Sequence, residues 1–303
     1  MKEVSIILVT HNNSPHLEPC LDSIFSQDFQ DYEVIIVDNG STDTHHLRIK
    51  ENYPNATLML NRDNLGPCKA RNQGIAKASG KFILCLDHDV ILPSNFLSNI
   101  LAVVKSDERV GAVGPKILLN DNRTIYSCGI RPSFLWRFHD IESGKSDTNG
   151  NSENKNVFGV SSAAAIYRKE ALESVKQQNE YFDEDISYLF DDVDLSWRMQ
   201  KKGWRILYVS GTSCLHSGGG SRNNDKISQY LCMRNRYLII IKNESLLGLL
   251  RLPFVFIIYD LWRNVYMLAI NRKLFFKASY ELLKSTPKVI AKRFKLPGGK
   301  YEN

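Results

Sequence analysis

Three apolar segments of this chain each end in a polar cluster, and this arrangement restricts the fold more than any other feature. Residues 4–9, 34–37 and 82–86 are apolar, and the clusters that follow them read THNN, DNGSTD and DHD. Continuous apolar strands are typical of parallel sheets, which are buried on both faces. Because ligands of such sheets bind at the carboxyl ends of the strands, we expect the three clusters to share one site.

Amphipathic helices alternate with these strands. Leu17, Leu21 and Ile24 recur at the spacing of one helical face, and residues 96–104 show the same pattern. Such alternation is typical of a parallel sheet that is covered by helices on both sides. The sequence therefore predicts an α/β, doubly wound fold with a mostly parallel sheet. Residues 139–156 are polar and rich in Gly, Ser and Asn, so we expect them to form a mobile surface loop.

The charge of the chain divides it into two parts. Apolar residues make up 43% and charged residues 24% of the sequence, as in ordinary globular proteins, which excludes a disordered chain. The net charge is +6, but from Arg251 onward 11 Lys and Arg residues stand against 3 Asp and Glu residues. Residues 1–250 hold 28 against 30. We expect a near-neutral body over residues 1–245 and a basic, amphipathic helical tail over residues 246–303.

The cluster Asp87-His88-Asp89 suggests a metal site. Two carboxylates at positions i and i+2 after a strand are able to face one hard cation, such as Mg²⁺ or Mn²⁺. The alternative is a capped turn that leads into Pro93, because acidic turns are common. The side chain of His88 points away from its neighbours in an extended segment, so we do not count it among the metal ligands.

A second acidic cluster precedes a predicted helix. Asp191, Asp192 and Asp194 fall within four positions, and one of them is expected to be the helix N-cap. A cap needs one carboxylate, and a general base beside a sugar hydroxyl would account for the excess. His216 is followed by three glycines, which allow a ligand to approach the backbone closely, although a structural histidine is the alternative.

The strand ends exclude two common nucleotide sites. THNNSP after the first strand contains no glycine, so the sequence carries neither a dinucleotide-binding fingerprint nor a phosphate-binding P-loop there. The ligand must instead be held by side chains. Asp38 is a candidate acceptor of hydrogen bonds from a uracil or a ribose, and a turn residue is the alternative.

Taken together, these segments resemble the family 2 glycosyltransferases of the GT-A fold, in particular their rhamnosyltransferase-like and galactofuranosyltransferase-like branch. The matching segments cover roughly residues 3–240 in the order found in the family. They read VSIILVTHNN, CLDSIFSQ, EVIIVDNGSTD, NLGPCKARNQGIAKASGKFILCLDHDV, YLFDDVDLSWRMQKKGW and LHSGGGS. The resemblance implies an inverting, metal-dependent transfer from a UDP- or dTDP-sugar to a hydroxyl of a glycan or a lipid-linked acceptor in cell-surface polysaccharide synthesis.

The resemblance also implies roles for particular residues. Asp192 matches the catalytic base, with Asp191 beside it. The metal, Mg²⁺ or Mn²⁺, falls to Asp87, Asp89 and His216, with Asp89 the more direct ligand. The positions that match the nucleotide-sugar site are Thr10, Asn12, Asp38, Asn39, Asn64, Arg71, Asp87 and His88.

The tail predicts a membrane surface as a partner. Lysines and arginines alternate with apolar and aromatic residues after residue 270, as in helices that lie in a membrane interface. Packing on the body or a homodimer contact is the alternative, and no nucleic-acid-binding motif accompanies the charge. The cysteines form no CxxC pair and the N-terminus resembles no signal peptide, so we expect a cytoplasmic protein on the inner face of the membrane.

Two other functions remain open at this point. A sugar-nucleotide pyrophosphorylase shares the predicted sheet, but it needs a glycine-rich basic loop after the first strand, which THNNSP lacks. A non-catalytic nucleotide-sugar-binding or membrane-scaffold protein derived from such an enzyme is the alternative of a different class. The presence of Asp87, Asp89, Asp192 and His216 together counts against it.

Overall fold

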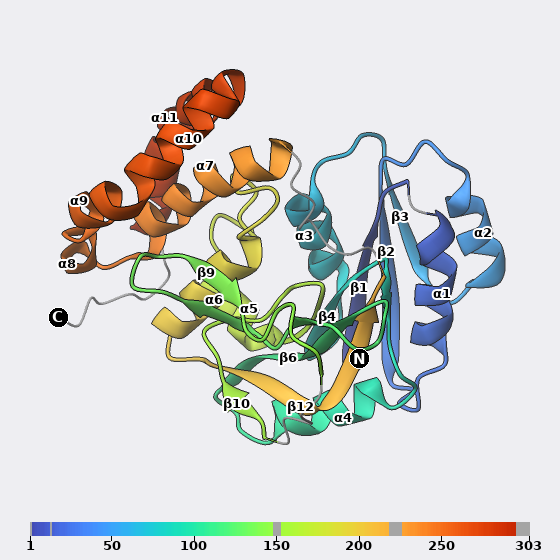
Figure 1. The fold of residues 1–303 in the computed structure, drawn as a ribbon. Helices are drawn as coiled ribbons and strands as arrows, with labels where there is room; N and C mark the ends of the chain where they lie inside the picture. Colours follow the sequence, from blue (N-terminus) through green and yellow to red (C-terminus); the bar gives the residue numbers. More distant parts are fainter. Residues whose placement is uncertain (1, 13, 148–152, 218–225, 295–303) are drawn as a thin grey trace.

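The computed structural model describes residues 2–12, 14–147, 153–217 and 226–294 (Figure 1). A ten-stranded sheet lies at its centre, in the order β10-β12-β6-β11-β4-β1-β2-β3, with β5 paired to β12 and β7 to β6. Strands β4, β1, β2 and β3 run parallel, while β11 inserts antiparallel between β4 and β6. The strands that make up this sheet are β1 (Val4–Thr10), β2 (Tyr32–Asn39), β3 (Thr57–Asn61), β4 (Phe82–Asp87), β5 (Val90–Ile91), β6 (Val110–Leu119), β7 (Ile125–Ser127), β10 (Lys155–Asn156), β11 (Ala164–Arg168) and β12 (Arg205–His216).

Helices cover both faces of the sheet, because the strand side chains alternate between two apolar cores. Ile6 and Leu8 of β1 pack with α1, α2 and α4 on one face, whereas Ile7 packs with α3, α5 and α6 on the other. All three side chains are fully buried. The helices of the two layers are α1 (Ser14–Phe25), α2 (His45–Asn52), α3 (Pro67–Lys77), α4 (Phe96–Lys105), α5 (Lys169–Val175) and α6 (Asp191–Lys201). The predicted doubly wound, mostly parallel fold is confirmed.

The segment over residues 139–156 differs from the mobile loop that its composition predicts. A small second sheet pairs β8 (Ile130–Pro132) with β9 (Phe138–Asp140), and backbone bonds continue beyond it, from Ile125 N to the oxygen of Lys145 at 2.9 Å. Lys116 Nζ, which is buried, donates to Asp147 at 2.9 Å. The prediction was wrong for the described part because polar residues find partners on β6 and β7; residues 148–152 lie outside the described ranges.

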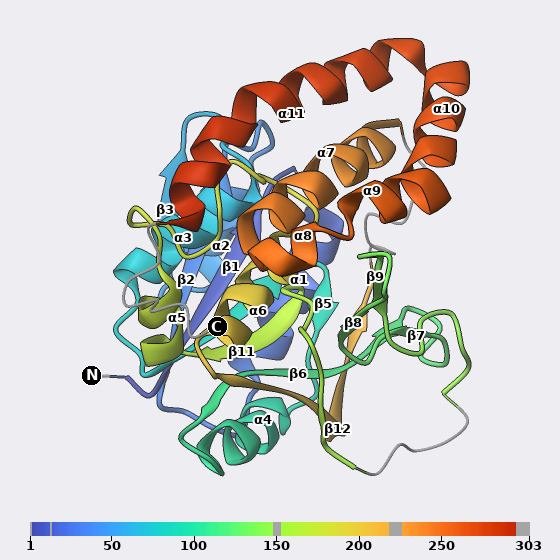
Figure 2. The same ribbon diagram turned by 90° about the vertical axis from the view of Figure 1, so that its left-hand side faces the viewer.

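The C-terminal helices gather at one end of the molecule, beside α7 (Figure 2). None of the helices in the described ranges is both long and apolar enough to span a bilayer. The long helix α11 lies along α7, and the turn before α10 is π-helical. These elements are α7 (Lys226–Asn243), α8 (Leu246–Leu249), α9 (Leu252–Val255), η2 (Phe256–Asp260), α10 (Leu261–Ile270) and α11 (Arg272–Arg293).

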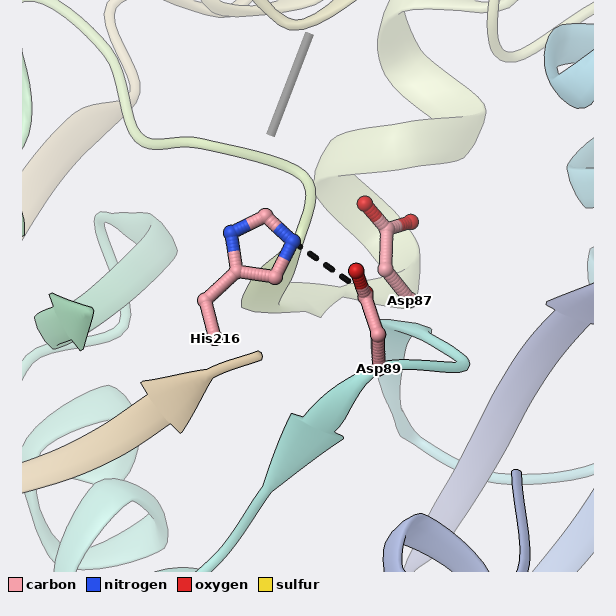
Figure 3. A group of neighbouring side chains, drawn as sticks. All are labelled: Asp87, Asp89 and His216. Atoms are coloured by element: carbon pink, nitrogen blue, oxygen red, sulfur yellow. Dashed lines mark ion pairs between the residues drawn. The ribbon is translucent and has the colours of Figure 1, made fainter. Parts of the chain in front are cut away.

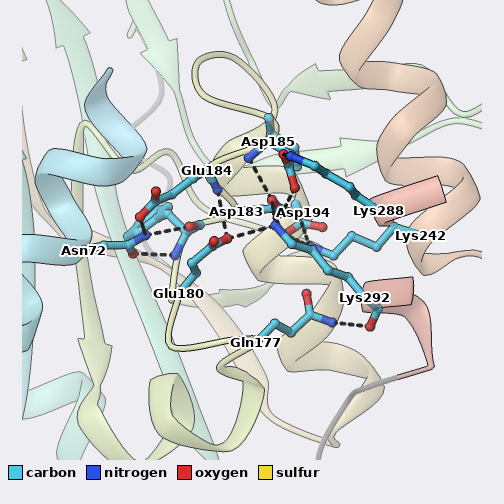
Figure 4. Close-up of polar contacts among 12 residues, drawn as sticks. Asn72, Gln177, Glu180, Asp183, Glu184, Asp185, Asp194, Lys242, Lys288 and Lys292 are labelled. Carbon is cyan, nitrogen blue, oxygen red and sulfur yellow. Dashed lines mark hydrogen bonds and ion pairs between the residues drawn. The ribbon is translucent and has the colours of Figure 1, made fainter. Parts of the chain in front are cut away.

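A buried ionic network joins the tail to the body (Figure 4). Lys292 of α11 and Lys242 of α7 both contact the carboxylate of Asp183, at 2.5 and 2.6 Å. Lys242 also contacts Asp194 of α6 at 2.8 Å. Burial alone raises the pKa of Asp183, but the two ammonium groups outweigh it and hold the pKa well below its usual range. The last turn of α11 is therefore an internal part of the structure, and three successive ion pairs connect it through Asp183 and Lys242 to Asp194 of α6. The division at residue 245 stays a prediction.

Candidate active site

One large cavity, of about 1180 Å³, opens at the carboxyl ends of β1 and β4. It collects most of the residues that the sequence singled out, and it also reaches η2 and α10 of the tail. Asn12 and Asp38 are not among its lining residues. The predicted residues that line it are Thr10, Asn39, Asn64, Arg71, Asp87, His88, Asp89, Asp191, Asp192 and His216.

The three predicted metal ligands lie close together (Figure 3), and all three line this cavity. Asp87 ends β4, and the pairing of β5 with β12 sets His216 opposite Val90, next to Asp89. His216 Nε2 lies 3.1 Å from Asp89 Oδ1, and one ligand atom from each of the three residues lies within 4.8 Å of the others. Burial raises the pKa of Asp89, but the hydrogen bond and charge of His216 outweigh it, so the net pKa is lowered.

The donor set of this cluster fits a divalent cation. Two carboxylates supply the hard oxygen ligands that Mg²⁺ and Mn²⁺ prefer, and an imidazole nitrogen suits a transition metal ion such as Mn²⁺. Asp89 and His216 are both buried, so an ion there would be well shielded on the protein side. His88 contacts the backbone oxygen of Val9 through Nδ1 at 3.3 Å and does not belong to this group of three residues.

Arg71 connects the candidate metal ligands to the acidic cluster at the start of α6. It lies on α3, is only 6% exposed, and donates from Nη2 to Asp87 at 2.7 Å and from Nη1 to Asp191 at 2.8 Å. Burial lowers the pKa of this guanidinium, but the two carboxylates more than compensate and the pKa is raised. Because one planar guanidinium donates to both carboxylates, it fixes the distance between them. Truncating Arg71 would leave both carboxylates without their cation.

The three aspartates at the start of α6 serve three different contacts. Asp191 pairs with Arg71, and Asp194 pairs with Lys242 and Arg198. The N-cap residue is Phe190, with φ of 67°, and its side chain makes no capping bond, while Asp192 Oδ1 accepts from the backbone N–H of Val193 at 2.8 Å. The expectation that one aspartate is the N-cap was wrong, because buried cations draw two of these carboxylates inward. Asp192 remains, and it lines the cavity.

Asp192 has the electrostatic setting of a general base. Burial is the largest cause that raises its pKa, and the negative charges of Asp191 and Asp140 add to it, so the pKa reaches about 8. A carboxylate with a pKa near neutrality accepts a proton more readily than an ordinary one. Asp140, which the sequence did not single out, is thus a neighbour of this group and also lines the cavity.

The backbone before Asp191 is held in an unusual conformation by a residue that sequence reasoning missed. Ser187, Leu189 and Phe190 have φ values of 61°, 63° and 67°, which bulky residues rarely adopt. The amide nitrogen of Asn235 on α7 donates to the backbone oxygens of residues 186, 188 and 189 at 3.1, 2.7 and 2.9 Å. Asn235 is fully buried. No motif around Asn235 indicates that it holds this backbone segment, because its partners lie almost fifty positions away.

The opposite side of the cavity gathers amides. The side-chain amide of Asn39 donates to Asn64 Oδ1 at 2.9 Å, and its own oxygen accepts from Leu65 N at 3.1 Å. The Oγ1 atom of Thr10 is buried and has no hydrogen-bond partner within the described ranges, so it is a ready contact for a ligand. Asp38 and Asn12 instead brace the turn after β2, through Ser41 N at 2.9 Å and Thr42 N at 2.7 Å. They support the site from outside the cavity.

Comparison with known proteins places the chain among glycosyltransferases. Residues 5–176 match the family model described as "Glycosyl transferase family 2". The chain is 27% identical over 71% of its length to a poly-beta-1,6-N-acetyl-D-glucosamine synthase of Staphylococcus aureus. It is 29% identical over 75% of its length to an O-antigen biosynthesis protein of Myxococcus xanthus. The chain spans about half the length of the first of these relatives and 18% of the second.

Two solved structures share the fold at low sequence identity. A crystal structure of GalNAc-T7 with UDP, GalNAc and Mn²⁺ aligns with a TM-score of 0.64 at 14% identity, over 98% of this chain and 58% of that chain. A crystal structure of S. aureus TarS 1-349 aligns with a TM-score of 0.57 at 18% identity, over 95% of this chain and 90% of that one. These likenesses support the predicted GT-A fold, and the family match extends over more than half of the chain. The chain belongs to glycosyl transferase family 2 and has the GT-A fold.

Proposed function

We propose that this chain is an inverting, metal-dependent glycosyltransferase that moves a sugar from a nucleoside diphosphate sugar to an acceptor hydroxyl. The observation that carries the proposal is the position of Arg71. It binds Asp87 of the candidate metal cluster and Asp191 beside the candidate base, so both functions open into one cavity. If Asp87 and Asp89 only formed a turn and the aspartates of α6 only capped the helix, one arginine would not need to join them.

In the proposed reaction, Asp192 removes the proton of the acceptor hydroxyl. The acceptor oxygen then forms a bond to the anomeric carbon, while the bond between that carbon and the diphosphate oxygen breaks and its electrons stay on the diphosphate. Attack on the face opposite the leaving group inverts the configuration of the sugar. A base with a raised pKa suits this step, because a more basic carboxylate accepts the hydroxyl proton more readily.

The chain's own residues hold the donor in this scheme. Asp87, Asp89 and His216 would hold Mg²⁺ or Mn²⁺, and a bound ion neutralises the negative charge of the diphosphate. Thr10, Asn39 and Asn64 line the part of the cavity that would hold the nucleotide. Thr10 Oγ1 is buried there without a partner in the described ranges. Asp38 and Asn12 orient the neighbouring turn. Which nucleotide the donor carries, UDP or dTDP, stays a prediction.

The acceptor is proposed to be a growing glycan or a lipid-linked sugar in polysaccharide synthesis. The printed names of the relatives point to surface polysaccharides, and the tail exposes a row of large apolar residues. Membrane contact at the cytoplasmic face would suit that surface, because basic residues beside an apolar helix face bind anionic lipid. The exposed apolar residues of the region before α11 include Leu246, Leu247, Leu250, Phe254, Ile257, Trp262, Val265 and Ile270.

Two experiments test these statements. The first titrates UDP and dTDP into the protein by calorimetry, with and without Mn²⁺, and follows nucleoside diphosphate release from a panel of nucleotide sugars. We expect one nucleotide to bind in a Mn²⁺-dependent manner; binding that ignores the metal would contradict the proposal.

The second experiment tests the membrane contact by vesicle flotation of the full chain. Leu247→Asp and Trp262→Asp, which are 80% and 68% exposed in the wild type, should reduce flotation with anionic vesicles. Leu47→Asp is the matched control, because Leu47 is 58% exposed on α2. Equal flotation of all variants would remove the membrane from the proposed function.

A further inference from the structure

Within the described residues four arginines line the cavity, and the proposed reaction gives two of them no role. Arg71 and Arg236 both line the cavity and are neutralised, Arg71 by Asp87 and Asp191 and Arg236 by Asp260 at 2.5 Å. Arg137 and Arg263 also line it. Over the residues that the structure describes, no carboxylate pairs with either of them. Two guanidinium groups are therefore available to a ligand in the cavity.

Arg137 and the buried Arg236 lie around one aromatic ring, that of Tyr259. The guanidinium of Arg137 lies 5.2 Å from the ring centre of Tyr259, and that of Arg236 lies 5.3 Å from the same ring. Arg263 follows Tyr259 by four positions in a continuous helical segment, so it lies on the same face one turn later. Arg137 thus contacts Tyr259, Arg263 follows Tyr259 along the same helical segment, and all three line the cavity.

The wall is fixed in place from behind. Arg236, which is buried, donates from Nε to the backbone oxygen of Trp136 at 2.9 Å and from Nη2 to that of Leu135 at 2.6 Å. Its pair with Asp260 then ties the turn that presents Arg137 to the segment that presents Tyr259 and Arg263. Three elements distant in sequence are held by one guanidinium, which is the construction expected of a binding site rather than of a solvated surface.

The acids that the reaction uses come from other elements than Arg137 and Arg263, although Asp140 ends β9, the strand that follows Arg137. The acids that the reaction uses, Asp87, Asp89 and Asp192, lie with Asp191 around Arg71 and His216, and Asp140 lies close enough to Asp192 to raise its pKa. The diphosphate of the donor belongs beside the metal cluster. An anion at Arg137 and Arg263 must therefore come from another molecule, and the acceptor is the other molecule that the cavity admits.

An apolar surface continues outward from the two arginines. Tyr266 and Met267 of α10 line the cavity, and Trp262, Val265 and Tyr266 are 68%, 52% and 59% exposed. A hydrocarbon chain would find partners on that side, while a phosphate would find two guanidinium forks at its base. Arginine is well suited to this contact because its planar fork binds two phosphate oxygens at once.

From this arrangement we propose that Arg137, Tyr259 and Arg263 bind the phosphate of an acceptor whose sugar is joined through phosphate to a hydrocarbon chain. The inference rests on the proposed function and names the class of acceptor for that site. The sugar hydroxyl reaches toward Asp192, the phosphate lies on the two arginines, and the chain leaves along α10.

The test is a set of calorimetric titrations on the full-length protein with three soluble probes, namely octyl phosphate, inorganic phosphate and octyl glucoside. Octyl phosphate should bind the wild type most tightly, and Arg137→Gln together with Arg263→Gln should weaken it by about tenfold or more. Arg131→Gln is the matched control, because Arg131 lies on β8 outside this cavity, and it should bind octyl phosphate as the wild type does. Each arginine is also changed singly, since Arg137 is exposed and its loss leaves the pair of Arg236 and Asp260 intact.

Other outcomes would overturn the proposal in distinct ways. Inorganic phosphate that binds as tightly as octyl phosphate would make this a site for free phosphate. Octyl glucoside that binds as tightly would make the contact purely apolar. If the double variant keeps its affinity for octyl phosphate but no longer floats with vesicles of phosphatidylglycerol, the arginines serve the bilayer surface instead.

A parallel titration separates this proposal from the proposed function. The double variant should bind the nucleoside diphosphate with Mn²⁺ as the wild type does. An equal loss there would assign the arginines to the donor and overturn the inference. If the wild type binds no nucleoside diphosphate, while octyl phosphate still depends on the arginines, the proposed function fails and the phosphate site stands.

Discussion

The two walls of the cavity differ in how the chain assembles them. On the sheet side, residues close together in sequence, such as Asp87 at the end of β4 and Asp89 just before β5, line the cavity. On the tail side, the wall combines Arg137 from the turn before β9 with Tyr259 and Arg263 from the C-terminal helices. The sheet side carries the candidate metal-binding acids, and the tail side carries Arg137 and Arg263, which pair with no carboxylate of the described residues. On our proposals, the sheet and α6 perform the reaction, whereas the tail and the turn before β9 select the acceptor.

The largest effect is expected from breaking the metal cluster on the sheet side. Asp89→Asn, or removal of divalent ions with EDTA, should lower the transfer rate by about 10³-fold or more, because neutralising the leaving diphosphate contributes several kcal/mol. The measurement is nucleoside diphosphate release with and without added Mn²⁺. Asp31→Asn, at an exposed ion pair with Lys2, is the control. An Asp89→Asn variant that keeps the wild-type rate and the wild-type dependence on Mn²⁺ concentration would exclude Asp89 from the metal site.

A smaller loss should follow from loosening the segment that positions Asp192. Asn235→Asp keeps the size of the side chain but removes the donor to the oxygens of residues 186, 188 and 189. Misplacement of the base by about 1 Å costs about 10²-fold in rate, so kcat should fall on that scale while KM for the donor stays constant. Asn99→Asp on α4 is the control on the other face of the sheet. A raised donor KM with unchanged kcat would show that Asn235 acts on binding instead.

The connection between tail and body predicts a difference between two lysines of α11. Lys292 is buried with Asp183, so Lys292→Met should lower the free energy of unfolding by about 3–5 kcal/mol. Lys288 pairs with Asp185 at 3.5 Å but is 71% exposed, so Lys288→Met should cost less than about 1 kcal/mol. Urea denaturation of the full chain measures both. Equal losses would mean that the tail is not anchored through Lys292.

The same network gives stability a predicted dependence on pH. Because the pKa of Asp183 is held below its unfolded value, its contribution is complete above that unfolded value. It should disappear as the pH falls through the lowered pKa of the folded state. Denaturation midpoints of the wild type and Lys292→Met, measured from pH 7 downward, should therefore converge in acid. A constant difference down to the lowest pH would contradict the assignment.

The smallest expected effect concerns the pH at which the base ionises. Because the pKa of Asp192 is raised to about 8 and the base must be ionised, kcat/KM should rise with pH through the range below that value. Asp140→Asn removes a negative charge that raises this pKa, so the acidic limb should move to lower pH. A full pH profile of both proteins checks this. An unmoved limb would show that Asp140 does not act on the base.

The features that the sequence predicts, the parallel sheet and the polar strand ends, share a physical reason. The apolar runs before Thr10, Asp38 and Asp87 indicate a parallel sheet, and parallel strands bring their ends to one edge whatever the rest of the chain does. The contacts of His216 with Asp89 depend on the pairing of β5 with β12, which no periodicity reveals, and here the family resemblance supplied the residue.

Elsewhere the sequence misled or was silent because the partners come from distant elements. One of Asp191, Asp192 and Asp194 was expected to cap the helix, but Arg71, which lies 120 positions before Asp191, draws Asp191 inward. Residues 139–147 read as a loop, yet Asp147 finds the buried ammonium of Lys116. Asn235, Arg137 and Asp140 carry no local signal at all. Long-range polar contacts of this kind decide the site, and composition does not encode them.

The central claim is that Asp192 takes the acceptor proton in a cavity whose metal cluster holds the donor. The most direct test measures Asp192→Asn in two ways, by transfer rate and by Mn²⁺-dependent nucleoside diphosphate binding. We expect transfer to fall by about 10²–10⁴-fold, as for loss of a general base, with nucleotide binding unchanged. Full transfer activity in a variant that binds metal and nucleotide normally would contradict the account.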